Sequence, residues 1–543
     1  MSTSRPAYTE VCRAFRWEDS HRALGWTATA PVNLAETIVD RHTGSGRPAL
    51  SWFGKDGASA MVTYDELSAR VSRFAGLLRS LGVEPGERVA GLLPRIPETL
   101  VTMLGTWKAG AIYVPIFTGF GPDAIAFRVQ DSGARMLCTH AAYRARVPDL
   151  PPGVRIITVG AAPAGDLESA KALSTHDDRC APVPRRRDDP AVLLYTSGST
   201  GPPKGVKIAT NFVLAIHPYM RYAVDLQSAD VFWPTGDPGW GYGLVCYMVA
   251  LAMGVPVICH EATPAAEFVL SRLRDLGVTN LATTPTLLRG IMALGEAAVR
   301  EHRVRVRAAS SCGEPLNPEV VTFFRRVWDV TVMDQYGSSE FGLPIGNFNA
   351  VDMTVKPGSM GIPLPGCRMA VVDDEGREAS PDTVGQIGMW PSVEGYYSLG
   401  YWNDDERTRA MWRGDWMTIG DLARRDEDGY FWFEGRSDDV IKSAGYRIGP
   451  FEVESAILRH PDVAEAAVVG KSDALRGQIV KAYVVLRSGV VPRSGLDAEI
   501  VELVKTRVGR HQYPREVEFV EQLPKTETGK IQRFLLREGG TRG

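Results

Sequence analysis

The segment of the sequence best suited to chemistry is rich in glycine and hydroxyl side chains and spans residues 195–205. It reads Tyr195-Thr196-Ser197-Gly198-Ser199-Thr200-Gly201-Pro202-Pro203-Lys204-Gly205 and follows an apolar run. Glycines let the main chain approach an anion closely, and hydroxyls and a lysine add hydrogen-bond donors. A flexible turn is the alternative, but this order directly after a buried strand favours a phosphate-binding loop. It is not a Walker A loop, because Lys204 is followed by Gly205 and not by serine or threonine.

Further segments carry polar side chains that could surround a nucleotide. They are Ser311-Cys312-Gly313-Glu314-Pro315-Leu316, Asp334-Gln335-Tyr336-Gly337-Ser338-Ser339-Glu340, Thr418-Ile419-Gly420-Asp421, residues 435–447 and residues 523–531. An aromatic ring followed by glycine could stack a base, Glu340 is a hard oxygen ligand for Mg²⁺, and Asp421 could accept ribose hydroxyls. Taken singly, each also fits a polar turn, a linker or, for Lys530, a solvated charge.

Apolar periodicity supplies the elements that must position these segments. Residues 64–81 and 97–109 predict helices, and residues 88–93, 112–116 and 191–195 predict strands. This alternation implies βαβ units, largely parallel sheets and helices on both faces, and therefore an α/β fold. Residues 181–190, rich in proline and arginine, predict a linker.

The pattern of helices, strands and breaker residues that the sequence predicts changes after about residue 350 and indicates two domains. Breaker-rich residues 356–366 and short strands at 369–372 and 430–433 predict a small β-barrel-like subdomain over residues 356–435. Residues 436–543 alternate strand and helix again, with apolar strands at 466–469 and 482–486, and predict an α+β module. We therefore expect an N-terminal domain of residues 1–435 and a C-terminal domain of residues 436–543.

The composition excludes several other classes of protein. The 543 residues carry 61 basic and 64 acidic side chains, a net charge of −3, so neither nucleic acid nor an anionic membrane is expected as a partner. Seven cysteines without a Cys-x-x-Cys pair argue against zinc and disulfides and favour a reducing cytoplasm. The N-terminus shows no signal segment. Glycine and proline interrupt the uncharged residues 241–259, which predict a buried helix (244–252) and strand (255–259) and no membrane span.

Taken together and in this order, the polar segments resemble the adenylate-forming superfamily of acyl-CoA synthetases, luciferases and peptide-synthetase adenylation domains. The resemblance covers nearly the whole chain, and residues 119–124, 237–240 and 312–318 are most similar to the acetyl-CoA and medium-chain acyl-CoA synthetase branch. It implies an AMP-binding domain, a mobile C-terminal domain and a hinge at Asp438. It also implies an ATP-dependent, AMP-forming carboxylate–CoA ligase that uses ATP, Mg²⁺ and CoA.

The resemblance assigns roles to residues at the motif positions. The nucleotide would be bound by Thr196, Ser197, Gly198, Ser199, Thr200, Gly201, Lys204, Gly313, Glu314, Pro315, Asp334, Gln335, Tyr336, Gly337, Ser339, Asp421, Arg436 and Lys530. Among them Ser339 would touch the α-phosphate, Glu340 would hold Mg²⁺ and Lys530 would be the adenylation lysine. CoA would pass Ser443, Ala444, Gly445 and Arg447.

The implied chemistry explains why such groups are wanted. A carboxylate attacking a polyanion needs clamped charges and aligned oxygens more than it needs acid–base work. In the family the C-terminal domain then rotates, withdraws the equivalent of Lys530 and presents residues 443–447 to the acyl-adenylate. Lys530 would be open to an acetyltransferase and a deacetylase when it is withdrawn, and acetylation would block adenylation.

The acyl group would lie against Trp240, Val278, Cys312 and Gly337. Acetate-specific members carry tryptophan at the position of Gly337, so glycine is expected to leave that volume open and to favour a medium-chain, branched or small aromatic acid. A short-chain acid, acetate or propionate, is one alternative. Transfer to a carrier-protein thiol is another, disfavoured because no carrier domain is fused to the chain. A scaffold without catalysis is a third, disfavoured because the catalytic positions are all filled.

Overall fold

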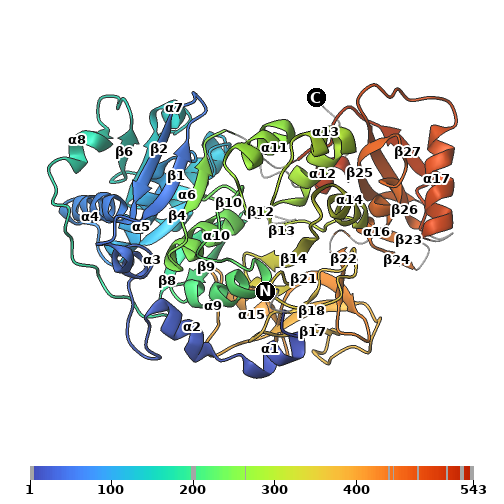
Figure 1. Cartoon of the computed structure of the whole chain (residues 1–543), viewed down its shortest axis with the longest axis horizontal. Coiled ribbons are helices and arrows are strands. Elements are labelled where there is room, and N and C mark those ends of the chain that lie inside the picture. Colours follow the sequence, from blue (N-terminus) through green and yellow to red (C-terminus); the bar gives the residue numbers. More distant parts are fainter. Residues whose placement is uncertain are drawn as a thin grey trace.

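The structure is a computed structural model, which describes residues 5–196, 203–262, 265–437, 439, 441–443, 446–473, 476–508, 512–525 and 531–537. The predicted C-terminal domain, red in Figure 1, stands at the opposite end of the molecule from helices α4 (Tyr64–Ser80) and α8 (Ser169–Leu173). None of the helices in the described part of the chain is long and apolar enough to cross a membrane.

The first sheet contains the two strands that flank the predicted phosphate loop. Its order is β19 (Ser398–Tyr401), β9 (Lys204–Ala209), β8 (Pro190–Thr196), β4 (Ile112–Pro115), β3 (Arg88–Leu92), β5 (Met136–His140), β6 (Arg155–Val159) and β7 (Leu167–Glu168). The strands from β8 to β7 are parallel, whereas β9 runs antiparallel to both of its neighbours. The parallel part carries the helices expected of βαβ units: α4, α5 (Pro97–Lys108), α6 (Pro122–Ser132), α7 (Ala141–Arg144) and α8.

The second sheet joins the first strands of the chain to its middle third. Its order is β16 (Ile362–Pro363), β15 (Gly342–Gly346), β14 (Val332–Ser338), β13 (Ala308–Cys312), β12 (Asn280–Thr283), β10 (Phe232–Pro234), β11 (Val257–His260), β1 (Pro48–Phe53) and β2 (Ser59–Thr63). Its helices are α9 (Phe212–Pro218), followed by a π-turn (Tyr219–Ala223), α10 (Gly241–Ala252), α11 (Ala266–Asp275), α12 (Pro285–Ala293), α13 (Glu296–Glu301) and α14 (Pro318–Trp328). The N-terminal helices are α1 (Tyr8–Ala14), α2 (Trp17–Leu24), α3 (Leu34–Ile38) and the short 3-10 turn Asp40–His42.

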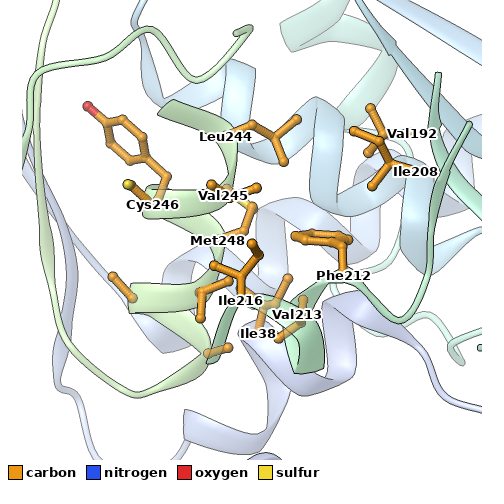
Figure 2. Packing of buried hydrophobic residues seen from close by; sticks show 14 of the residues in the cluster. Ile38, Val192, Ile208, Phe212, Val213, Ile216, Leu244, Val245, Cys246 and Met248 are labelled. Atoms are coloured by element: carbon orange, nitrogen blue, oxygen red, sulfur yellow. The ribbon is translucent and has the colours of Figure 1, made fainter. Parts of the chain in front are cut away.

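A shared hydrophobic core holds the first two sheets together. Side chains of α9 and α10 pack with those of β8 and β9: Figure 2 shows Phe212 and Leu244 toward Val192 and Ile208, and Ile216 toward Met248 of α10. Helix α10 is buried almost all round, which explains why its uncharged sequence resembles a membrane span without being one.

The third sheet is the predicted β-rich subdomain. Its order is β17 (Arg368–Val372), β18 (Gly385–Trp390), β21 (Trp416–Arg425) and β20 (Trp412–Arg413), and β22 (Phe431–Arg436) pairs with β21. Helix α15 (Asp405–Ala410) precedes β20. The strand Ser398–Tyr401 lies in the same stretch of sequence but joins the first sheet, and this exchange brings Tyr401 beside Lys204.

The C-terminal module is an α+β layer with its own core. Its sheet has the order β24 (Tyr446–Ile448), β23 (Ile441–Ser443), β26 (Gly477–Leu486) and β25 (Val463–Asp473), with β27 (Glu516–Phe519) paired to β26. Helices α16 (Pro450–Ile457), α17 (Leu496–Arg507) and α18 (Arg533–Arg537) complete it. Buried apolar residues of these elements form a separate cluster.

Polar contacts join the C-terminal module to helix α14. The side-chain amide of Asn317 donates to Ser455 Oγ at 3.0 Å, and Arg459 Nε lies 2.7 Å from Glu319 Oε1. At the same boundary Glu434 of β22 lies against the main chain of Gly449. These contacts fix one orientation of the module.

The proline- and arginine-rich residues 181–190 differ from the expected linker. The main chains of Val32 and Arg185 exchange hydrogen bonds of 2.9 and 2.8 Å, and the side-chain amide of Asn33 donates to the carbonyl of Val183 at 2.8 Å. The segment is therefore pinned beside α3 and α5 and leads into β8 within the first sheet.

Candidate active site

A cavity of about 1180 Å³ lies where the three N-terminal sheets and the C-terminal module meet. Its wall includes every described residue that the sequence assigns to nucleotide binding, together with the predicted Mg²⁺ ligand Glu340: Thr196, Lys204, Gly313, Glu314, Pro315, Asp334, Gln335, Tyr336, Gly337, Ser339, Asp421 and Arg436. Because these residues come from distant parts of the chain, their convergence at one cavity is the central geometric finding.

The phosphate loop begins and ends at this wall. Thr196 closes β8 and Lys204 opens β9, and the two residues are register partners in the antiparallel pair. The predicted phosphate ligands Ser197, Gly198, Ser199, Thr200 and Gly201 lie outside the described residues.

A compact network of three side chains is built around Lys204, the first residue of β9. Tyr401 Oη donates to Glu340 Oε1 at 2.8 Å, Lys204 Nζ donates to Tyr401 Oη at 2.8 Å, and Lys204 Nζ lies 3.2 Å from the same carboxylate oxygen. Burial and the charge of Glu340 raise the pKa of Tyr401, so its hydroxyl stays protonated as a donor. The network fixes a cation and a carboxylate at the end of the phosphate loop.

The geometry at Glu340 fits the binding of Mg²⁺ together with phosphates. The residue is 6% exposed and lines the cavity, and its contacts with Tyr401 and Lys204 both use Oε1. Among the described residues, no group of three or more His, Cys, Asp or Glu side chains is placed so that it could hold a metal ion by itself. Mg²⁺ sites on nucleotides typically use one or two carboxylates and complete their shell with phosphates and water, so one carboxylate here is sufficient.

A second network lies on the β21–β22 pair. Asp421 and Arg436 are register partners, and Arg436 Nη1 donates to Asp421 Oδ1 at 3.1 Å. Tyr336 Oη donates to Asp421 Oδ2 at 2.6 Å. Burial, followed by the negative charge of Asp421, raises the pKa of Tyr336. An aromatic ring, a carboxylate and a guanidinium are thus locked together, as a base and ribose site requires.

The third part of the wall is built by the ends of β13 and β14. Gly313 has φ +107°, a conformation that other residues rarely adopt, and it brings the main chain against the ring of Trp240. Arg289 Nη2 pairs with Glu314 Oε2 at 2.5 Å, which orients the 313–315 turn. Burial raises the pKa of Asp334 to about 8, although the N–H groups of Leu316 and Gln335 donate to it.

The volume beside Gly337 is not open, in contrast to the expectation from sequence. A Cβ at Gly337 would lie 2.4 Å from the carbonyl oxygen of Gly342 and 2.5 Å from Leu343 Cδ2. The β14–β15 hairpin therefore fills the space that a larger side chain would take. Gly337 lines the cavity with its main chain, and the absence of a side chain lets Gly342 and Leu343 pack directly against it.

Two other acyl-pocket expectations need correction. Val278 is 1% exposed, precedes β12 and belongs to the core cluster between α11, α12 and α14, so it is absent from the described cavity wall. Because Val278 comes before the first residue of β12, it lies at the end of the strands opposite the one that borders the cavity. Cys312 is 2% exposed and lies in the core beneath Gly313, while Trp240 does line the cavity.

The C-terminal module presents its C-terminal edge to the cavity. Lys525 and Ile531, which flank the predicted catalytic lysine, line the wall together with Arg533. Lys530 itself lies outside the described residues, as do Asp438, Ala444, Gly445 and the side chain of Arg447. Ser443 is described, but it is 6% exposed and does not line the cavity.

The structure adds residues that the sequence did not single out. Tyr401 lies 197 residues from Lys204, and only the pairing of β19 with β9 brings them together. Arg289 on α12 holds both Glu314 and Asn317, the latter at 3.3 Å. A glycine before Tyr401 and a helix pattern around Arg289 are too common to reveal either role.

Comparisons with known proteins agree with this arrangement. The family model of AMP-binding enzymes matches residues 38–402, and that of the AMP-binding enzyme C-terminal domain matches residues 452–530. The chain is 36% identical to acetyl-coenzyme A synthetase of Bacillus subtilis (strain 168), over 98% of this chain and 94% of that protein. Among solved structures, an acyl-CoA synthetase of Brucella canis is 38% identical, with TM-score 0.79 over 98% of this chain and 99% of that one. An anthranilate CoA ligase in complex with anthranoyl-AMP is 28% identical, with TM-score 0.84 over 95% and 98%.

Proposed function

This chain belongs to the AMP-binding enzyme family, and on that premise we propose that the cavity activates a carboxylic acid as its adenylate for transfer to CoA, a medium-chain, branched or small aromatic acid being the first candidate substrate. It is an acid–thiol ligase that forms AMP and uses ATP, Mg²⁺ and CoA. The observation that carries the proposal is the single cavity into which the Lys204–Glu340 pair and the Tyr336–Asp421–Arg436 network both face.

In the proposed adenylation step the chain's own residues bind and align. Asp421, held by Tyr336 and Arg436, accepts the ribose hydroxyls and thereby fixes the α-phosphate relative to the acid. Glu340 would hold Mg²⁺, which neutralises phosphate charge when it is bound, and Lys204 places a further cation there. No general base is required, because a carboxylate attacks in its ionised form.

Lys530 is the proposed adenylation lysine, and it would add its charge from the C-terminal module. Support comes from Lys525 and Ile531, which line the cavity on either side of it in the sequence. In this orientation Ser443 is away from the cavity wall, as expected if the proposed CoA segment 443–447 is presented only after a rotation about Asp438. The two half-reactions would then use two faces of one module.

The division of labour is tested with Lys530→Ala. We expect the variant to lose pyrophosphate release from ATP and acid, while thioester formation from synthetic acyl-adenylate and CoA continues near the wild-type rate. The wild-type lysine acetylated in vitro should behave in the same way. Equal loss of both half-reactions would refute the rotation.

A second candidate substrate, acetate or propionate, is favoured by a specific observation. Leu343 and the Gly342 carbonyl occupy the space beside Gly337, so a short acyl group would suffice to fill what remains next to Trp240. AMP release should be measured with acids from acetate to decanoate and with benzoate, each with and without CoA. A maximum between butanoate and octanoate, or at benzoate, supports the first proposal, and a maximum at acetate or propionate supports the second.

A further inference from the structure

Arg128 is a buried cation in the cavity wall that no step above uses. It lies on α6 and is 4% exposed, yet its side chain lines the cavity together with Thr196 and Lys204. Tyr195, over whose ring the Arg128 guanidinium lies at 5.8 Å, directly precedes Thr196. Arg128 therefore stands beside the entrance to the phosphate loop.

The surroundings of Arg128 hold the guanidinium in place without neutralising it. Nη1 donates to the carbonyl oxygen of Ala124 at 2.8 Å, and the guanidinium lies 3.9 Å from the ring centroid of Phe120. Nε is buried and has no acceptor among the described residues. Asp131, one turn further along α6, instead accepts a hydrogen bond of 2.5 Å from Tyr195 Oη.

A buried guanidinium without a carboxylate is costly unless a ligand supplies the negative charge. Burial lowers the pKa of Arg128 to about 10, so the side chain is still a cation at neutral pH. In the described part of the chain it forms no ion pair, whereas Lys204 in the same wall pairs with Glu340. The planar fork of an arginine matches two oxygens of a phosphate, and the stacking on Phe120 keeps that fork in one plane.

We propose that Arg128 binds a phosphate group that enters the cavity beside the phosphate loop. The phosphate comes from one of two substrates of the ligase: the pyrophosphate that leaves ATP, or a phosphate of CoA. Arg128 is then a binding residue either for the departing pyrophosphate or for a phosphate of CoA, in addition to Lys204. This inference rests on the ligase function proposed above.

A direct binding measurement tests the role of Arg128 independently of the proposed ligase function, because the measurement requires no acid and no turnover. Isothermal titration of the full-length protein with inorganic pyrophosphate and Mg²⁺, with CoA and with pantetheine compares the wild type with Arg128→Met and Arg128→Gln. Methionine retains the apolar stem, and glutamine can still donate to the Ala124 carbonyl, so at least one variant should fold as the wild type does. Arg128→Lys retains the charge.

The loss of one charge-assisted contact should lower the affinity for the ligand that Arg128 contacts about tenfold or more. If both neutral variants bind pyrophosphate more weakly and Arg128→Lys recovers part of the lost affinity, the phosphate comes from ATP. If the affinity for CoA falls while that for pantetheine does not, the phosphate comes from CoA. Unchanged binding of both ligands overturns the inference, and so does a weakening that is equal for CoA and pantetheine.

Arg88→Met is the matched control. Arg88 also contacts α6, through hydrogen bonds of 2.6 and 2.8 Å to the carbonyls of Ser132 and Gly133, and it also stacks on an aromatic ring, that of Trp402. It does not line the described cavity wall. Its replacement should therefore reproduce any structural effect on α6 while leaving pyrophosphate and CoA binding unchanged. An equal loss of binding in Arg88→Met would assign Arg128 a structural role and refute the proposal.

Discussion

Replacing Gly337 by alanine tests how the acyl side of the cavity is closed. The added Cβ would lie 2.4 Å from the Gly342 oxygen and 2.5 Å from Leu343 Cδ2, while real Cβ atoms essentially never lie closer than 3.0 Å to such neighbours. The main chain at Gly342 has little room to move away, because the Tyr397 ring packs against it. Gly342 has φ +71°, and a Cβ built there would lie only 3.0 Å from that ring. The β14–β15 hairpin must therefore shift as a unit.

The cost of Gly337→Ala follows from this geometry. Overpacking of a tight site typically costs about 1–3 kcal/mol. The same shift displaces Tyr336 and Glu340, which flank the glycine and carry the nucleotide contacts. A misplacement of about 1 Å can lower a rate about a hundredfold. We therefore expect lower stability and a fall in kcat/KM that is similar for every acid.

The assay combines thermal unfolding with kcat/KM for acetate, butanoate, octanoate and benzoate. Gly290→Ala is the control, because a Cβ at Gly290 on α12 meets only Ala266 Cβ at 3.6 Å and should be neutral or slightly stabilising. The reasoning is refuted if Gly337→Ala leaves stability unchanged and shifts preference toward acetate. That result would mean that the glycine does open the pocket.

Three further predictions concern groups around the cavity and the domain boundary. Tyr336→Phe removes the donor to Asp421, and the KM for ATP should rise about tenfold with little change in the KM for CoA. Tyr401→Phe removes the hydroxyl that joins the phosphate-site lysine and carboxylate, and ATP–pyrophosphate exchange should slow about tenfold or more while thioester formation from supplied acyl-adenylate persists. Burial and then the nearby Glu452 raise the pKa of Glu434 from 4.5 to about 7. Its contribution to stability is therefore fully present below pH 4.5 and is lost as the pH rises through about 7, and Glu434→Gln should flatten this dependence by about 3 kcal/mol in thermal unfolding.

Each of these three has a result that would contradict it. An unchanged KM for ATP in Tyr336→Phe would remove Asp421 from ribose binding. Equal slowing of both half-reactions in Tyr401→Phe would indicate general misfolding. The same pH profile in Glu434→Gln and wild type would show that other groups titrate at the boundary, and Arg424, whose Nε lies 3.2 Å from Glu434 Oε1, would be the next residue to replace.

Local sequence patterns predicted the elements well where one rule applied. The helix expected at residues 64–81 is α4, and it begins with a capping box between Thr63 and Glu66. The strand expected at 88–93 is β3, and the uncharged run 241–259 does divide into α10 and β11. In each case the burial pattern and the breakers are contained in the segment itself.

Properties that depend on a distant partner were not predictable in this way. Whether Gly337 opens or closes a pocket depends on the hairpin return at Gly342 and Leu343, which no motif encodes. Val278 was assigned to the pocket by its motif position, but the edge of the sheet at which a residue lies depends on where its strand begins. Tyr401 was missed because its strand pairs with a part of the chain that is remote in sequence.

The position of strand β19 also has a consequence for synthesis of the chain. β19 is the outermost strand of the first sheet, and it covers the outer edge of β9, the strand that starts with Lys204. During translation β9 emerges long before its partner, since 197 residues separate Lys204 from Tyr401. Until then the nascent chain presents unpaired main-chain groups along β9, and such edges promote intermolecular pairing. A fragment that ends before residue 398 would retain this exposed edge permanently, so truncations intended to isolate the N-terminal part should include residue 401.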